Sequence, residues 1–225
     1  MEAPENTIES FEYSIKVGSS YIETDVQLSS DGIPYIFHDD DLSRLFGKDI
    51  IFNSLHSNEI NKLMLFDNYK IPTLESTLNK FPNVFFQIDV KTDEVVVPAL
   101  EVIKKTNSIN KVCIASFSSK RLKQVRNLYP EICLSMGPYE VMKLLLASYG
   151  LYGNKVPGNC LQIPIYQYGI KLVTKRFISY VHSIGLKIHV WTINDEDTML
   201  KLIDLGVDGI ITDRPKTLKN LLSDH

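Results

Sequence analysis

The sequence predicts an α/β fold, a TIM-type (β/α)8 barrel that lacks its first strand. Short apolar runs rich in β-branched and aromatic residues alternate with amphipathic stretches of helical period along most of the 225 residues, which is typical of parallel strands joined by helices. The chain opens on a helical stretch, and seven strands follow where a closed barrel needs eight. The expected strands cover residues 21–27, 84–90, 111–116, 132–136, 160–164, 187–192 and 209–212.

The first helix is expected over residues 7–17. Asn6 and Glu9 have the spacing of a capping box at its start, and Gly18 suits the left-handed position just after its end. Between them the apolar residues recur with helical spacing. The signals at both ends therefore predict a helix ahead of the first visible strand.

Later strands are followed by stretches that also have helical spacing. Thr73 is placed to cap the helix after it, and Asn194 is placed to cap the last helix before Gly206 ends that repeat. Residues 40–71 do not fit the alternation. We expect this segment to be an excursion over one end of the barrel, where it shapes access for a substrate.

The composition is that of a globular chain, and one domain over residues 1–225 is expected because α/β barrels reach this length undivided. The net charge of -3 and the scattered Lys and Arg argue against a nucleic-acid partner. No stretch is apolar enough to be a transmembrane segment. The cysteines are odd in number and lack metal-site spacing, so we expect buried free thiols in a reducing, cytoplasmic setting. They are Cys113, Cys133 and Cys160.

Chemically active residue types gather in residues 21–39. Glu23 and Asp25 lie two apart on an expected strand, so both side chains point to one face. A turn at residues 29–32 returns the chain as a hairpin and brings His38 back toward them. By itself the pair also fits a solvated strand edge. Together with His38 it favours a site for a hard cation, Mg²⁺ or Ca²⁺, beside a general acid or base.

Further motifs follow in a fixed order along the chain. They are PENT (4–7), IETDV (22–26), SDG (30–32), FHD (37–39), QIDVK (87–91), ASF (115–117), VWTIN (190–194) and GVDGIITD (206–213). Each is weak alone, but as a set they resemble the glycerophosphodiester phosphodiesterase family over nearly the whole chain. The resemblance implies a TIM barrel of the phospholipase-C-like phosphodiesterase type.

The resemblance also implies roles for particular residues. Glu23, Asp25 and Asp89 would be ligands of a divalent cation, although the family usually has Glu where this chain has Asp89. His38 would be the general acid. Structural alternatives remain open for these residues. Asp89 also fits a solvated acid at a strand end, Lys91 a lysine at the barrel rim, and Trp191 and Phe117 aromatic residues of the core. The implied substrate contacts are Lys91, Trp191, Glu5, Ser116 and Phe117.

In the resembling family the first strand ends in a His-Arg-Gly motif shortly before the PENT segment. Only three residues precede Pro4 here, so that motif and its histidine, the implied base, have no counterpart. Because every later motif is intact, we expect a truncated sequence instead of a degenerate family member. The activity and stability of the chain as written are accordingly in doubt.

The expected function is hydrolysis of a glycerophosphodiester to glycerol 3-phosphate and an alcohol, a phosphoric diester hydrolase activity in lipid metabolism with a small-molecule substrate. Three alternatives remain open. One is a catalytically impaired barrel that binds a phosphorylated metabolite, and another is a phospholipase-D-like lipid phosphodiesterase. The third is an unrelated barrel enzyme with a phosphate site at residues 206–213, which leaves the carboxylate pair and His38 unexplained.

Overall fold

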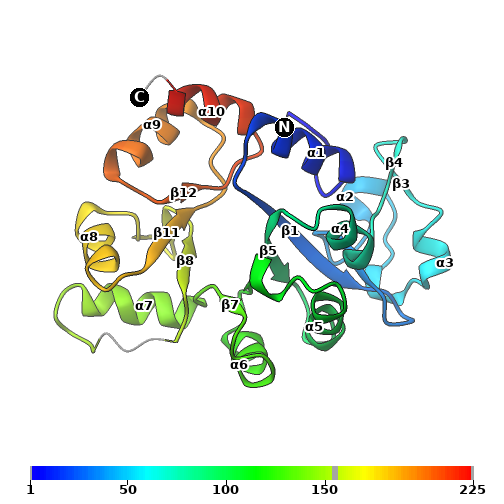
Figure 1. Cartoon of the computed structure of the whole chain (residues 1–225), viewed down its shortest axis with the longest axis horizontal. Coiled ribbons are helices and arrows are strands. Elements are labelled where there is room, and N and C mark those ends of the chain that lie inside the picture. The colour runs from blue at the N-terminus through cyan, green and yellow to red at the C-terminus, as the bar shows by residue number, and fades with distance from the viewer. Residues whose placement is uncertain (1, 154–156, 224–225) are drawn as a thin grey trace.

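A computed structural model describes residues 2–153 and 157–223 of the chain. The strands form a ring at the centre and the helices lie around its outside (Figure 1). In the described part seven strands run parallel, as predicted, although the fourth and the last are shorter than expected. They are β1 (Tyr21–Leu28), β5 (Phe85–Val90), β6 (Val112–Ala115), β7 (Cys133–Leu134), β8 (Cys160–Ile163), β11 (Lys187–Val190) and β12 (Gly209–Ile210).

Two sheets make up the ring and meet on one side at a narrow seam, while on the other side no strand pairing joins β12 to β1 in the described residues. One has the order β2-β1-β5-β6-β7, in which β2 (Pro34–Ile36) is antiparallel to β1, and the other has the order β12-β11-β8. An isolated bridge between Ser135 and Cys160 joins them. Next to it the Met136 N–H donates to the Cys160 carbonyl at 2.9 Å, and the Asn159 N–H donates to the Leu134 carbonyl at 2.8 Å. Each sheet packs its own apolar cluster, so the seam carries little apolar packing of its own.

The helices largely follow the predicted stretches. Thr73 caps the helix after it, and Gly18 and Gly206 end theirs with φ of 100° and 80°, as predicted. In the described part no helix is both long and apolar enough to cross a membrane. The helices that cover the ring are α1 (Ile8–Val17), α4 (Leu74–Lys80), α5 (Val96–Lys105), α6 (Ser119–Leu128), α7 (Pro138–Ala147), α8 (Lys175–Ser183), α9 (Glu196–Leu205) and α10 (Pro215–Ser223), with the short 3-10 turn η2 (Ile109–Lys111) before β6.

Two predicted caps are wrong by one residue. Thr7, and not Asn6, begins α1, because its hydroxyl accepts from the Ser10 N–H at 3.1 Å and the Ser10 hydroxyl accepts from the Thr7 N–H at 3.3 Å. Asp195, and not Asn194, begins α9. In both places the polar residue just before the true cap turns its side chain to a tertiary partner instead.

Replacing Thr7 with alanine is expected to lower the free energy of unfolding by about 1 kcal/mol, because the Ser10 N–H loses its acceptor inside a packed structure. Urea unfolding followed by circular dichroism measures the change. Glu9→Ala is the control, since Glu9 occupies the wrongly predicted capping-box position, and it should change stability by less than about 0.5 kcal/mol. Equal losses in the two variants would contradict the Thr7 cap.

Segment 40–71 folds into short elements beside the β1–β2 hairpin. Phe37 at the end of the hairpin stacks on Phe52 with ring centroids 4.4 Å apart. Both rings belong to a separate apolar cluster with Ile60 and Leu65, so the segment is anchored where the hairpin ends. Its elements are α2 (Ser43–Phe46), η1 (Phe52–Ser54), α3 (Ser57–Ile60), β3 (Met64–Leu65) and β4 (Tyr69–Lys70), and a similar small hairpin, β9 (Tyr166–Gln167) with β10 (Ile170–Lys171), follows β8.

The first described residue ties the two ends of the chain together. The Glu2 N–H donates to the Asp213 carbonyl at 3.0 Å. The Glu2 carboxylate accepts from the backbone N–H groups of Lys216 and Thr217 at 2.8 and 3.2 Å. Burial alone would raise the pKa of Glu2, but these hydrogen bonds at the start of α10 hold it below its ordinary value. The start of the chain is thus attached beside β12.

Candidate active site

Three carboxylates from two neighbouring strands line one cavity. Glu23 and Asp25 lie on β1, and parallel pairing places Asp25 directly opposite Asp89 of β5. Asp25 and Asp89 are only 7% and 6% exposed. Burial raises the pKa of Glu23 well above its ordinary value, and the nearby charges of Asp25 and Asp89 raise it further. The cavity therefore crowds three acidic groups together in a buried place.

Lys91 lies between two of these carboxylates. Its Nζ is 2.7 Å from Oδ1 of Asp25 and 2.9 Å from Oδ2 of Asp89. Burial alone would lower the pKa of Lys91, but the two carboxylates hold it well above its ordinary value. Oδ1 of Asp89 is buried and has no hydrogen-bond partner among the described residues. One ammonium group thus faces three carboxylates and leaves a buried acceptor unsatisfied.

Asn6 holds the other side of Asp25. Its Nδ2 donates to Oδ2 of Asp25 at 3.2 Å, and its Oδ1 accepts from the Thr24 hydroxyl at 2.7 Å. These two bonds fix the amide orientation, and Asn6 has a φ of 53° at this position. The sequence interpretation as a helix cap missed this role, although Asn6 lies in the PENT motif. Asn6 is therefore a positioning residue for Asp25.

His38 stands at the cavity rim, where the β1–β2 hairpin ends. The Phe37 N–H donates to the Asp25 carbonyl at 3.0 Å, which holds the returning chain beside the carboxylates. Nδ1 of His38 lies 2.6 Å from Oδ1 of Asp39. A carboxylate only accepts, so Nδ1 carries the proton and Nε2 is the nitrogen left for a substrate.

Arg44, from the segment that the sequence motifs did not cover, holds Asp39 in place. Its Nε and Nη2 donate to the two oxygens of Asp39 at 2.7 and 3.0 Å. Burial alone would raise the pKa of Asp39, but the bonds from Arg44 and His38 hold it below its ordinary value. Glu5, an expected substrate contact, accepts from Nη1 of Arg44 at 2.5 Å and is not among the residues that line the cavity. Arg44 and Asp39 were missed as site residues because no local pattern joins them.

The remaining predicted residues lie around the same cavity, which has a volume of about 210 Å³. Phe117 and Trp191 meet edge to face with centroids 5.6 Å apart and form an aromatic wall. The Ser116 hydroxyl donates to the Val90 carbonyl at 3.1 Å and accepts from the Ser118 N–H at 3.2 Å. Ser116 is thus engaged in holding strand ends, while the aromatic pair presents apolar surface to the cavity.

Two glutamines complete the cavity and were not predicted as site residues. Gln162 on β8 donates its Nε2 to Oε1 of Gln87 on β5, across the ring. Oε1 of Gln162 is buried and has no hydrogen-bond partner among the described residues. Gln87 lies in the QIDVK motif but was given no role, and Gln162 lies in no motif. The pair offers a neutral acceptor opposite the carboxylates.

The sequence model of the glycerophosphoryl diester phosphodiesterase family matches residues 1–217. The chain belongs to this family. Probable glycerophosphodiester phosphodiesterase 2 of Mycobacterium tuberculosis is 32% identical over 225 residues, which cover 97% of this chain and 85% of the relative. The resemblance inferred from the motifs is therefore confirmed.

Solved structures of glycerophosphodiester phosphodiesterases and related enzymes superpose on the whole chain. A phosphodiesterase of Oleispira antarctica, in complex with the product sn-glycerol-3-phosphate, gives a TM-score of 0.82 at 25% identity and covers 99% of this chain and 92% of that one. A glycerophosphodiester phosphodiesterase of Thermotoga maritima gives a TM-score of 0.73 at 27% identity, with 96% and 92% covered. The predicted TIM-barrel class of the fold is confirmed.

The oxygen atoms that line the cavity can be compared with the ligands that a divalent cation requires. Glu23, Asp25 and Asp89 supply only oxygen ligands, which hard cations prefer. The unpaired Oδ1 of Asp89 and the crowding of three acidic groups beside the ammonium of Lys91 both favour an additional cation. The residues present therefore fit Mg²⁺ or Ca²⁺.

Proposed function

We propose that the chain hydrolyses glycerophosphodiesters to glycerol 3-phosphate and an alcohol, with a divalent cation bound by Glu23, Asp25 and Asp89. One observation carries the proposal: His38, oriented by Asp39, stands at the rim of a cavity that holds three carboxylates and a buried ammonium. The relative from Oleispira antarctica that holds sn-glycerol-3-phosphate supports the same choice of substrate class.

The cation, Mg²⁺ or Ca²⁺, would act as a Lewis acid on a phosphate oxygen when bound. His38 acts as the general acid. As water attacks phosphorus, releasing its own proton to solvent, and the bond to the leaving oxygen breaks, Nε2 of His38 gives its proton to the departing alcohol, while the Nδ1 proton stays on His38 and remains hydrogen-bonded to Asp39. The Asp39 carboxylate, itself held by Arg44, stabilises the imidazolium before transfer and keeps the ring aimed at the cavity.

The other lining residues bind and orient the substrate. Lys91 supplies a fixed positive charge beside the phosphate. Trp191 and Phe117 form the apolar wall against which glycerol or an alkyl group packs. Glu5 acts indirectly, by holding Arg44, and Ser116 acts by fixing the end of β5. Segment 40–71 forms one wall of the entrance, since its residues Asp40, Asp41, Ser43 and Arg44 border a second cavity. That cavity also reaches Lys91 and Phe117.

A cytoplasmic location is part of the proposal. The three cysteines are free thiols, as expected in a reducing compartment. The substrate class is a small, water-soluble metabolite that needs no membrane site.

The proposed function is tested by measuring glycerol 3-phosphate released from glycerophosphocholine, glycerophosphoethanolamine and lysophosphatidylcholine, with Mg²⁺, Ca²⁺ or EDTA present. We expect cation-dependent release from the first two substrates. Preference for lysophosphatidylcholine, with lysophosphatidic acid as product, would favour a phospholipase-D-like lipid phosphodiesterase. Binding of glycerol 3-phosphate without turnover of any diester would favour the catalytically impaired barrel.

Gln162→Leu is expected to raise KM for glycerophosphocholine by about 10-fold while kcat changes little, because the unpaired Oε1 of Gln162 is placed to accept from a glycerol hydroxyl. Methylation of that hydroxyl in the substrate should cost the wild type a similar factor and the variant almost nothing. The control is Gln167→Leu on β9, which lines the same cavity outside the Gln87–Gln162 pair. An unchanged KM in Gln162→Leu would contradict this role.

A further inference from the structure

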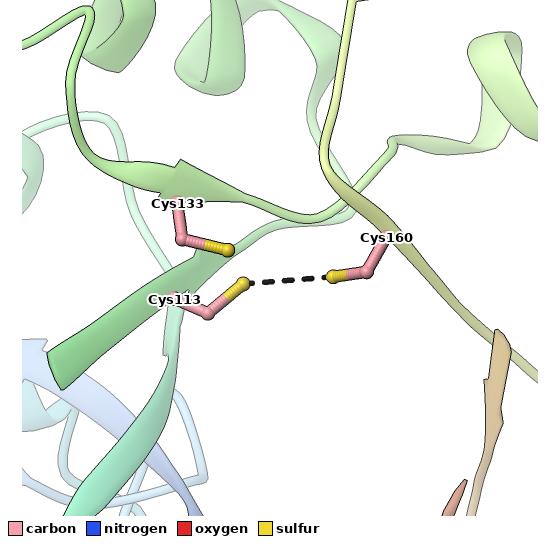
Figure 2. Close-up of side chains that lie close together, drawn as sticks. All are labelled: Cys113, Cys133 and Cys160. Carbon is pink, nitrogen blue, oxygen red and sulfur yellow. Dashed lines mark hydrogen bonds between the residues drawn. The ribbon is translucent and has the colours of Figure 1, made fainter. Parts of the chain in front are cut away.

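All three cysteines of the chain converge in space although no spacing in the sequence joins them. Cys113 lies on β6, Cys133 on β7 and Cys160 on β8, and Figure 2 shows their side chains pointing toward one another. The three Sγ atoms all lie within 4.8 Å of one another, and those of Cys113 and Cys160 are 3.7 Å apart. The cysteines are free thiols, as expected, and two of them are buried, but Cys133 is partly exposed and no signal in the sequence indicated that the three would meet.

The cysteine triad is separate from the catalytic cavity. Each cysteine is the first or second residue of its strand, whereas the cavity is lined by the residues two positions later in the chain, Ala115 on β6, Ser135 just after β7 and Gln162 on β8. Because side chains two apart on a strand share a face, the sulfur atoms form the next layer of the barrel interior beneath the cavity floor. None of the three cysteines lines the cavity.

The triad also spans the seam of the ring. Cys113 and Cys133 are register partners in the first sheet, while Cys160 belongs to the second and forms the bridge with Ser135. The two apolar clusters lie on either side of this junction. A bond network through the three sulfur atoms would therefore strengthen a junction that is otherwise linked by a few backbone hydrogen bonds and by side-chain bonds such as that of Gln162 to Gln87.

We propose that Cys113, Cys133 and Cys160 bind a thiophilic metal ion, Zn²⁺ or Cu⁺, that ties β6, β7 and β8 together. A tetrahedral ion with Zn–S bonds of about 2.3 Å places its sulfur ligands about 3.8 Å apart, which matches the separation of Cys113 and Cys160. Thiolates select such soft ions over Mg²⁺ and Ca²⁺. Cys113 and Cys160 are 8% and 9% exposed, so the ion enters past the partly exposed Cys133, where a water or an external thiol completes the coordination.

Binding converts three thiols to thiolates and releases their protons to solvent, so affinity for the ion falls as the pH is lowered. No electron transfer is involved. A disulfide is the competing outcome: it would join two of the sulfurs at about 2.05 Å and leave the third as a free thiol. A second competing outcome is simple contact between three reduced thiols, with no bond among them. These outcomes differ in the number of reactive thiols and in the response to metal.

The test uses the full chain, reduced and freed of metal. Titration with Co²⁺ is expected to produce a thiolate-to-cobalt charge-transfer band that saturates at one ion per chain and is displaced by Zn²⁺, and competition with a Cu⁺-selective chelator tests the second ion. Zn²⁺ should protect all three thiols from Ellman's reagent. Cys133→Ser and Cys160→Ser should each abolish the band and the protection.

The control is the Glu23→Gln plus Asp25→Asn variant, which should keep the full charge-transfer band because the band arises from sulfur ligands and neither substitution removes a sulfur. A circular dichroism spectrum matching the wild type verifies that each cysteine variant folds. The proposal is overturned if the wild type gives no band, if the band survives in Cys160→Ser, or if air oxidation leaves one reactive thiol and metal has no effect.

Discussion

Replacing His38 with alanine is expected to lower kcat on glycerophosphocholine by about 10²–10⁴-fold, the range for loss of a general acid. Choline leaves as a poorly stabilised alkoxide unless a proton reaches it, and Nε2 of His38 is the group placed to supply that proton. A nitrophenyl diester needs no such proton, because its leaving group departs as a stable anion. Its turnover should fall far less. Steady-state kinetics on the two substrates in parallel measure the difference.

His182→Ala is the matched control for this experiment. His182 also pairs with a carboxylate, since its Nε2 lies 2.9 Å from Oδ2 of Asp208, but it belongs to α8 on the outside of the ring. The variant should retain activity on both substrates. Added imidazole should restore part of the activity of His38→Ala, since the vacated rim is open to solvent. Equal losses on both substrates, without rescue, would instead make His38 a structural residue.

Strand and helix alternation was predictable because it depends on local burial. Each parallel strand appears in the sequence as a run of apolar residues, and each covering helix as apolar residues at helical spacing. Neither pattern depends on the residues on the opposite side of the barrel. The caps failed where two adjacent residues could both cap a helix. Asn6 precedes Thr7, and Asn194 precedes Asp195. Tertiary partners decide between them: Asn6 is drawn to Asp25 and Thr24, which leaves Thr7 to cap α1.

The carboxylates of the site were predictable for a related reason. Glu23 and Asp25 are in phase on one strand, and parallel pairing brings Asp89 beside them. Contacts across the ring left no such signal in the sequence. Gln87 reaches Gln162 over 75 positions, and the cysteine triad joins three strands whose spacing resembles no known metal motif. Arg44 came from the one segment that fits no repeat.

Neutralising two of the carboxylates should have the second large effect. In the wild type, Mg²⁺ or Ca²⁺ at 100 times its Kd is expected to stabilise the fold by about 2.7 kcal/mol, which corresponds to a rise in Tm of about 5–11 °C for a chain of this size. Glu23→Gln plus Asp25→Asn should abolish the rise, because Asp89 alone remains and Lys91 already binds it at 2.9 Å. Differential scanning fluorimetry with and without the cation measures both values.

The same double variant should lose nearly all glycerol 3-phosphate release, while its Tm without cation stays equal to the wild-type value or rises, because the substitutions relieve the crowding of acidic groups and Lys91 keeps its ion pair with Asp89. Loss of activity without loss of Tm would show that Glu23 and Asp25 bind the cation. If the two carboxylates only stabilised the fold, the variant would have a lower Tm both with and without the cation. Glu94→Gln plus Glu101→Gln removes the same charge from exposed positions and should leave activity and the response to cation intact. An undiminished rise in Tm in the Glu23 and Asp25 variant would place the cation elsewhere and leave these carboxylates as partners of Lys91.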